Sequence, residues 1–326
     1  MAQEPLKKPD PGYYDYWAYR DRPKISWPNG ARLALWVAPN IEFYELNPPA
    51  NPFRKAWPRP FPAIQGYGIR DWGNRVGHQR QMEVLDHYGI RGSISLSTAL
   101  CDHHPEIIEL CVERNWEFFS HGIYNTRYTY GMSETQEREM IRDSMETIHR
   151  HTGQQCAGYL APALSHSEFT LDLFAEVGSE LFGDAGGIYT CDLFHDDQPT
   201  PIHLRSGKRF VSVPYSLEMN DTIAYVVNKV TPRHYGQMLR DCFDRLYAEG
   251  EQSGTVMCIP THNYQVSCPH RLRAFDQALE YITAHSDVWI TTGREIAQYY
   301  LEHCYDASVA SISGQQQVRI PEGAAA

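Results

Sequence analysis

The chain has 326 residues, of which 42% are hydrophobic and 21% are charged, and its formal net charge is −11. This composition is typical of folded globular proteins and excludes the disordered and fibrous classes. The 29 basic residues are outnumbered by 40 acidic ones and form no basic run, which argues against a nucleic-acid-binding protein. No stretch approaches the roughly 20 apolar residues of a membrane-spanning helix, so we expect no membrane insertion.

The chain begins with an aromatic arm, residues 1–22. The arm lacks the apolar core of a secretory signal peptide, so we expect a cytoplasmic protein. Its composition also suggests that it packs on a neighbouring subunit, which predicts a homo-oligomer. The aromatic residues of the arm are Tyr13, Tyr14, Tyr16, Trp17 and Tyr19.

The first predicted strand, Arg32–Pro39, is a run of aliphatic residues typical of a buried parallel strand. Residues 43–73 follow as a predicted loop, because six prolines lie between Pro48 and Pro62. The loop also carries Phe53, Trp57 and Phe61, so we expect it to pack as an ordered lid over the site.

Helices and strands then alternate. We predict strands at 92–97, 116–120, 156–160, near 181, at 210–213, 255–261 and 288–291. Predicted helices cover about Asn74 to Tyr88 and begin near Pro105. Further helix starts are indicated by Ser133-x-x-Gln136, Ser165-x-x-Glu168, Thr231-Pro232 and Thr292-x-x-Glu295.

This regular alternation, without a break in composition, favours one α/β domain over two. About seven β–α units predict a single (β/α) barrel that covers residues 23–304. We expect residues 305–326 to form a polar, loosely ordered C-terminal tail. The eight cysteines include no C-x-x-C pair, so we expect them to be small buried residues rather than zinc ligands or redox centres.

Polar residues that directly follow the predicted strands are the candidate site, because active sites of parallel barrels lie at the carboxyl ends of the strands. The first strand is followed by Asn40 and Glu42. The strand at 116–120 is followed by His121 and Asn125, and the strand at 255–261 is followed by His262. We expect three strands to bring these side chains to one face of the barrel.

Glu42 and His121 suit a divalent cation such as Zn²⁺, which accepts carboxylate oxygen and imidazole nitrogen ligands. Such a metal lowers the pKa of a bound water and polarises a carbonyl group. His262 is then placed to act as a general acid that protonates a leaving nitrogen. This set of residues predicts hydrolysis of an amide or ester.

Seven segments resemble the polysaccharide deacetylase superfamily, and within it the allantoinase and cyclic imide hydrolase branch. The resemblance extends from about Pro23 to His303. Its carriers, in order, are Trp27–Ala34, Asn40–Glu42, Asp71–Gly77, Ser120–Gly122, Asp196–Pro199, Thr261–His262 and Asp287–Ile296.

The resemblance implies a distorted (β/α)7 barrel, often tetrameric, that hydrolyses a carbon–nitrogen bond other than a peptide bond. It implies that Glu42 and His121 bind the metal and that His262 is catalytic. Two positions depart from the family pattern. Asn40 occupies the place of the catalytic base but cannot accept a proton. Asn125 replaces the second metal-binding histidine, and its amide oxygen is a weaker ligand than imidazole.

The absence of a signal peptide and the long lid predict a small-molecule substrate, such as a cyclic imide, a ureide or another planar amide. The resemblance implies that Arg75 anchors this substrate, and we expect Trp72, Trp57 or Tyr124 to stack on it. Two alternatives remain: a deacetylase of a small N-acetylated sugar-like compound, and a non-catalytic barrel that binds a ligand.

Overall fold

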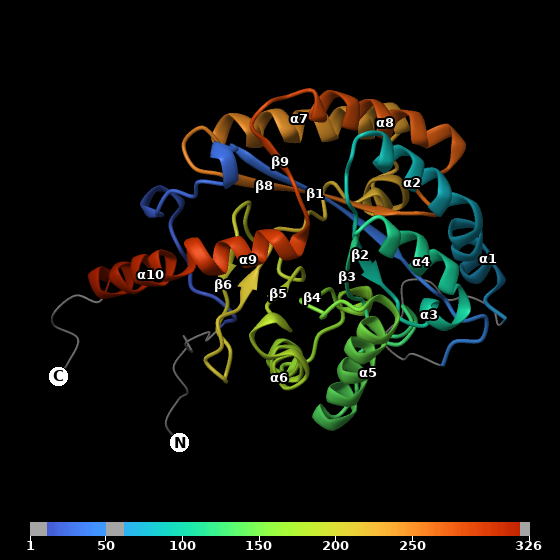
Figure 1. Ribbon diagram of the computed structural model, residues 1–326, viewed down its shortest axis with the longest axis horizontal. Coiled ribbons are helices and arrows are strands. Elements are labelled where there is room, and N and C mark those ends of the chain that lie inside the picture. The colour runs from blue at the N-terminus through green and yellow to red at the C-terminus, as the bar shows by residue number, and fades with distance from the viewer. Residues whose placement is uncertain (1–11, 50–61, 320–326) are drawn as a thin grey trace, which may run out of the picture.

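The computed structural model describes residues 12–49 and 62–319, and Figure 1 shows this part of the chain as a curled sheet with helices around it. The sheet of the described residues runs in the order β6-β7-β5-β4-β3-β2-β1-β8, with β9 beside β1. This α/β half-barrel agrees with the predicted single distorted barrel. The strands are β1 (Leu33–Ile41), β2 (Ser93–Leu96), β3 (Glu117–Ser120), β4 (Gly158–Tyr159), β5 (Tyr189–Thr190), β6 (Thr200–Pro201), β7 (Val211–Ser212), β8 (Thr255–His262) and β9 (Val288–Ile290).

Strand β1 pairs with three other strands of the sheet. It pairs in parallel with β8 along eight positions, from Leu33 opposite Thr255 to Asn40 opposite His262. The start of β1 also pairs with β9 and its end pairs with β2, again in parallel. All nine residues of β1 are buried, as expected for a parallel strand covered on both faces. The pairing of β6 with β7 is the antiparallel one.

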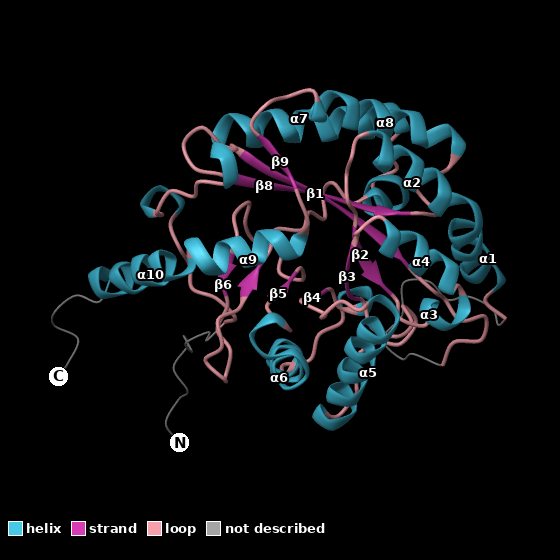
Figure 2. Ribbon diagram, in the orientation of Figure 1, coloured by secondary structure: helices cyan, strands magenta, loops and turns pink. Residues whose placement is uncertain are grey.

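Helices cover the outer face of the curled sheet, as Figure 2 shows. None of the described helices is long and apolar enough to cross a membrane. The α-helices are α1 (Ile64–Trp72), α2 (His78–His87), α3 (Leu100–His103), α4 (Pro105–Glu113), α5 (Glu134–Thr152), α6 (Thr170–Phe182), α7 (Pro232–Glu249), α8 (Pro269–Thr283), α9 (Gly293–His303) and α10 (Tyr305–Arg319). Two π-helical turns, η3 (Gly73–Gly77) and η6 (Ile223–Val227), complete the helices named below.

Three of the four helix starts predicted from sequence motifs are confirmed, and α4 begins at Pro105 as predicted. Ser133 and Gln136 form a reciprocal capping box, and the Thr231 and Thr292 hydroxyls each accept a backbone N–H from the first turn of their helix. The prediction for Ser165 is wrong, because α6 begins at Thr170. The Ser165 hydroxyl instead donates to the Pro162 carbonyl oxygen and accepts the backbone N–H of Thr129.

Three other elements differ from the prediction. Helix α1 occupies part of the predicted loop, where glycines and neighbouring prolines concealed it, and η3 joins it to α2. Leu181 belongs to α6 and not to a strand, because the apolar stripe of that helix extends to Phe182. The polar tail is helical as α10 up to Arg319. The central part of the predicted lid, with Phe53, Trp57 and Phe61, lies outside the described residues.

The described part of the N-terminal arm packs on its own chain. Trp17 is buried and donates its indole N–H to Ser311 in α10, 3.1 Å away. Arg22 forms a bidentate ion pair with Asp196, at 2.7 and 2.6 Å. Gln198 donates to the Gly254 carbonyl oxygen just before β8. The Asp196–Pro199 segment therefore lies between β8, at one end of the strand order, and β6, at the other.

The predicted chemistry of the cysteines agrees with the structure. All eight are free thiols, and five of them are buried. Burial raises the pKa of the Cys101 thiol to about 12 and that of Cys156 to about 12. These protonated, shielded thiols act as small apolar residues.

Candidate active site

Five of the predicted site residues line one cavity of about 230 Å³ at the carboxyl ends of the strands. Asn40 lies near the end of β1 and Glu42 directly follows that strand. His262 ends β8 opposite Asn40, and His121 follows β3. Asn125 is the fifth. The parallel arrangement of β1, β3 and β8 is the reason that residues more than 200 positions apart in the chain meet here.

The Glu42 carboxylate is the centre of this cluster. Its Oε1 lies 3.7 Å from Nε2 of His121 and 3.7 Å from Nε2 of His262. Its Oε2 accepts the Tyr264 hydroxyl hydrogen at 2.6 Å and lies 3.7 Å from Nε of Arg70. Burial by itself raises the pKa of Glu42, but the adjacent His121 and the positive charges of His262 and Arg70 outweigh burial and lower the pKa to about 2. Glu42 is therefore a stable anion and a poor general base.

His262 is held by a buried carboxylate that the sequence did not reveal. Its Nδ1 lies 2.7 Å from Oδ1 of Asp221, which is completely buried in the chain. The other oxygen of Asp221 accepts the backbone N–H groups of His262 and Val266. Burial lowers the pKa of His262, but the charge of Asp221 and its hydrogen bond outweigh burial and raise it. Asp221 therefore favours the imidazolium form of His262, in which Nε2 also carries a hydrogen.

His121 is held by a backbone carbonyl group and not by a carboxylate. Its Nδ1 lies 2.8 Å from the carbonyl oxygen of Leu160, which can only accept a hydrogen bond. Nδ1 therefore carries a hydrogen, so in the singly protonated ring the electron pair lies on Nε2. His121 is suited to receive a proton, whereas His262 is suited to donate one.

Asn40, which occupies the expected position of the catalytic base, is a structural donor here. Its amide nitrogen lies 2.9 Å from the Tyr215 hydroxyl oxygen and 3.2 Å from the Thr261 carbonyl oxygen. It also contacts the Ala38 carbonyl oxygen at 3.3 Å. An amide NH₂ group satisfies these acceptors, and a carboxylate does not.

The predicted metal ligands do not form a metal-binding set in this arrangement. The amide oxygen of Asn125 accepts the Ala163 backbone N–H at 3.1 Å, so its nitrogen faces Glu42 and donates to Oε1 at 2.5 Å. Tyr264 already donates to the other oxygen of Glu42. Among the described residues, no three His, Cys, Asp or Glu side chains are grouped as a metal site. The residues present therefore do not fit the expected zinc ion.

Three predicted substrate-binding residues are not among the residues that line the cavity. Arg75 projects from η3 with 69% of its side chain exposed, and it pairs with Asp71 at 2.8 Å. The Trp72 ring lies beneath the Arg80 guanidinium, 5.8 Å away. Tyr124 packs against Phe43 at the rim. The predicted stacking residue Trp57 lies in the part of the chain that is not described.

The Asp71–Gly77 segment contributes to the site in another way. It packs against the backbone that follows His262, because Gly73 and Gly77 lack the Cβ atoms that would collide with Asn263. Asn263 donates to the amide oxygen of Asn74 at 2.8 Å, and Asn74 donates to the backbone carbonyl of Glu42 at 3.1 Å. This segment therefore connects the ends of β8 and β1.

Sequence reasoning missed Arg70, Tyr44, Tyr264 and Asp221. Tyr44 and Tyr264 each stand two residues after a predicted site residue, and this alternation after a strand was an available signal. Arg70 directly precedes the Asp71–Gly77 motif. Asp221 lies in no recognisable motif, and only the folded chain brings it to His262.

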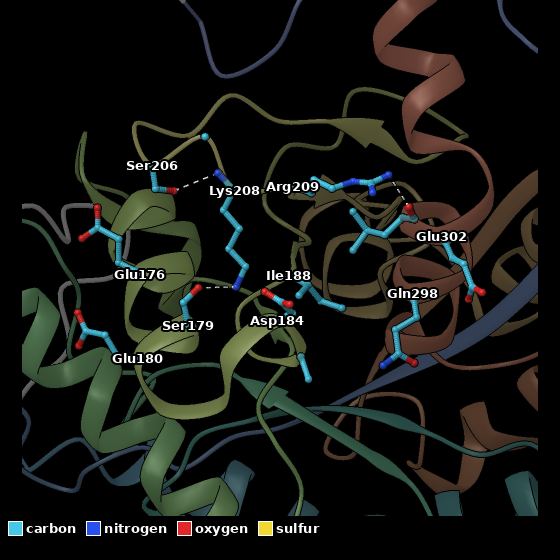
Figure 3. Close-up of a pocket in the computed structure, with 13 residues that line it drawn as sticks. Glu176, Ser179, Glu180, Asp184, Ile188, Ser206, Lys208, Arg209, Gln298 and Glu302 are labelled. Carbon is cyan, nitrogen blue, oxygen red and sulfur yellow. Dashed lines mark hydrogen bonds between the residues drawn. The ribbon is translucent and has the colours of Figure 1, made fainter.

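Figure 3 shows a second cavity, of about 1060 Å³, between α6 and α9. Ile188 and Arg209, which line it, lie just before the parallel strands β5 and β7. This cavity is therefore at the opposite end of the sheet from the histidine cluster. Lys208 crosses it and donates to the Ser179 hydroxyl at 2.8 Å. Its described lining contains no histidine or cysteine, so we assign the chemistry to the smaller cavity.

Comparison with known sequences gives a family match over part of the chain. Residues 71–182 match the polysaccharide deacetylase family. A peptidoglycan deacetylase of Helicobacter pylori is 24% identical, over 71% of this chain and 86% of that protein. The matched segment begins with the Asp71–Gly77 motif and includes His121 and Asn125.

Solved structures share the fold across most of the chain. A crystal structure of PuuE allantoinase has a TM-score of 0.75 at 26% identity, covering 87% of this chain and 95% of that one. A probable polysaccharide deacetylase from Pseudomonas aeruginosa also has a TM-score of 0.75, at 24% identity, covering 86% and 95% of the two chains. These structures support the same barrel.

Proposed function

Because the chain carries a domain of the polysaccharide deacetylase superfamily, we propose that it hydrolyses a non-peptide carbon–nitrogen bond of a small amide, imide or ureide. The observation that carries the proposal is the placement of His121 and His262, whose Nε2 atoms each lie 3.7 Å from the same oxygen of Glu42. Two imidazoles thus flank one buried anion, with Nδ1 hydrogen-bonded to Asp221 in His262 and to the Leu160 carbonyl oxygen in His121.

The proposed proton transfers use these two histidines. Nε2 of His121 accepts a proton from the attacking water, because its Nδ1 hydrogen is held by Leu160. Nε2 of His262 donates a proton to the leaving nitrogen, and Asp221 stabilises the imidazolium before that step. Glu42 remains ionised and stabilises positive charge on either ring. No step uses Asn40 or a metal ion.

The size and lining of the cavity favour a single small ring over a polymer. The cavity measures about 230 Å³, and its lining includes a group of aliphatic side chains. A sugar chain requires an extended groove, and a cavity of this size does not provide one. The aliphatic residues are Leu160, Ala163, Leu164, Leu217 and Ile223.

Turnover of a substrate panel tests the proposal. The purified full-length chain is assayed with hydantoin, succinimide, acetamide and N-acetylglucosamine, alongside His121→Ala and His262→Ala variants. The matched control is His303→Ala, which removes an imidazole that is about half exposed on α9. We expect both site variants to lose roughly 100-fold or more in kcat and the control to keep its activity. Unchanged turnover in both site variants contradicts the proposal.

The same assay separates the alternatives. A deacetylase of a small N-acetylated compound, which the Helicobacter pylori relative favours, releases acetate from N-acetylglucosamine and opens no ring. A non-catalytic barrel binds a ligand and consumes none of the panel. Elemental analysis and chelator treatment address the metal: because the donor groups of Asn125 and Tyr264 occupy Glu42, we expect turnover to persist after chelation. A stoichiometric metal whose removal abolishes turnover contradicts this expectation.

A further inference from the structure

Arg70 is the one Arg or Lys among the described residues that line the cavity. It belongs to α1, and its side chain is only 14% exposed. Its guanidinium lies between two tyrosine rings, 3.8 Å from the centre of Tyr44 and 4.4 Å from the centre of Tyr264. The two rings come from the segments after β1 and β8, so the plane of the guanidinium is set by three separate elements.

Arg70 makes no direct hydrogen bond to Glu42, its nearest anion. Nε of Arg70 lies 3.7 Å from Oε2 of Glu42, which is beyond hydrogen-bonding distance. The Glu42 oxygens take their hydrogen bonds from Asn125 and Tyr264 instead. Nε of Arg70 is buried with no hydrogen-bond partner among the described residues. The guanidinium has five N–H donors and lines the cavity, so it can offer a hydrogen to an acceptor on a bound ligand.

We propose that Arg70 is the specificity-determining cation of this site and binds the carbonyl oxygen of a planar amide or imide ring. The proposal rests on the proposed function and adds to it the residue that recognises the ring. Negative charge gathers on the carbonyl oxygen when water attacks, and a fixed guanidinium stabilises that charge. The flat donor fork of arginine also matches the flat edge of an imide better than lysine does.

Arg75, for which the family resemblance implies this role, provides the matched comparison. It lies five residues further along the same helical segment, carries the same charge and pairs with Asp71 outside the cavity. A loss that follows from removing Arg70 but not Arg75 is therefore a property of the site and not of the net charge.

Binding of two planar rings tests the role of Arg70 without requiring turnover. Barbituric acid is a delocalised anion at neutral pH, and uracil is a neutral ring of similar shape. Calorimetry measures both affinities for the full-length wild type, Arg70→Gln, Arg70→Lys and Arg75→Gln. We expect the wild type and Arg75→Gln to bind barbiturate about tenfold or more tightly than uracil. The reason is that Arg70 forms a charge-assisted hydrogen bond with the anionic ring and only an ordinary one with the neutral ring. Arg70→Gln removes the preference, and Arg70→Lys keeps part of it.

The ratio of the two affinities is the readout, because a general loss of folding lowers both together. If Arg70→Gln does not fold, Arg70→Lys is the variant to compare, because lysine keeps the positive charge. An unchanged ratio in Arg70→Gln, an equal loss in Arg75→Gln, or a wild type that binds neither ring overturns the proposal. If the wild type hydrolyses nothing in the panel but its barbiturate preference depends on Arg70, the proposed function fails and the role of Arg70 stands.

Discussion

Asp221 accepts the Nδ1 hydrogen of His262 at 2.7 Å, and its second oxygen accepts the backbone N–H of the same histidine at 2.8 Å. One buried carboxylate thus holds both the ring and the backbone of His262. The ring can neither rotate nor change its tautomer without losing a charge-assisted hydrogen bond. This pair makes His262 the most firmly positioned proton donor of the cavity.

Asp221→Asn is expected to lower kcat by roughly 100-fold or more. The asparagine oxygen can still accept the two backbone N–H groups, and its NH₂ then faces Nδ1 of His262. This arrangement forces the hydrogen to Nε2 and removes the charge that stabilises the imidazolium. Steady-state kinetics measure the loss. The control is Asp15→Asn, which alters an exposed carboxylate–imidazole pair with His203; a similar loss in that variant counts against a specific role of Asp221.

Asn40→Asp is expected to reduce stability and not to create a better enzyme. Its amide nitrogen faces the carbonyl oxygens of Thr261 and Ala38, and a buried carboxylate there is repelled by both. We expect a loss of at least about 2 kcal/mol in the free energy of unfolding, measured by chemical denaturation. Asn115→Asp, at an exposed position, should change it by less than about 0.5 kcal/mol. Increased turnover in Asn40→Asp argues for a latent base at this position.

Gly77→Ala is expected to damage both stability and activity. A Cβ at this position collides with the backbone oxygen of Asn263, next to His262. Relief of the overlap requires a shift at the end of β8, at a cost of about 1–3 kcal/mol. A small displacement of His262 should lower kcat by roughly 100-fold.

Gly68→Ala is the matched control for Gly77→Ala. It lies in α1, and a Cβ there meets nothing within 4 Å. Because alanine favours the helix, we expect a gain of up to about 1 kcal/mol and unchanged kinetics. Chemical denaturation and steady-state kinetics measure the free energy of unfolding and kcat of both variants. Equal values for the two variants contradict the close packing of η3 on the end of β8.

His78 is expected to make the protein less stable in mild acid. Burial, with a smaller effect from the charge of Arg114, lowers the pKa of His78 from 6.5 to about 4. Between these values the unfolded chain binds a proton at His78 that the folded chain does not, so stability falls as the pH drops from 6.5 to 4. The total effect is about 3 kcal/mol.

Melting temperatures of the wild type and His78→Gln between pH 7 and pH 4 test this prediction. The glutamine carries no titrating group, so the stability of the variant should depend less steeply on pH even if its value at pH 7 is lower. His234→Gln, at an exposed position in the first turn of α7, is the control and should retain the steep dependence. If the melting temperatures of the wild type and His78→Gln fall equally with pH, His78 is not the group that destabilises the protein in acid.

Much of the fold was predictable because it depends on local patterns. The aliphatic run of β1 and the caps at Ser133 and Thr292 act within a few residues, and the structure has them as expected. The strand ends also located Glu42, His121 and His262 correctly in one cavity. Helix α1 was missed because its glycines and the preceding prolines mask a helical pattern.

The sequence by itself determined the α/β barrel, its buried first strand and the three strand ends where polar residues meet, because these follow from hydrophobic periodicity and parallel strand order. Only the tertiary structure decided which cation faces the cavity. Arg70 and Arg75 lie on one helical segment, and the π-helical turn after Trp72 together with the contact between Gly77 and Asn263 directs Arg70 inward and leaves Arg75 exposed. The partners of His262 and Asn125 were likewise decided by contacts between distant segments, which no local pattern encodes.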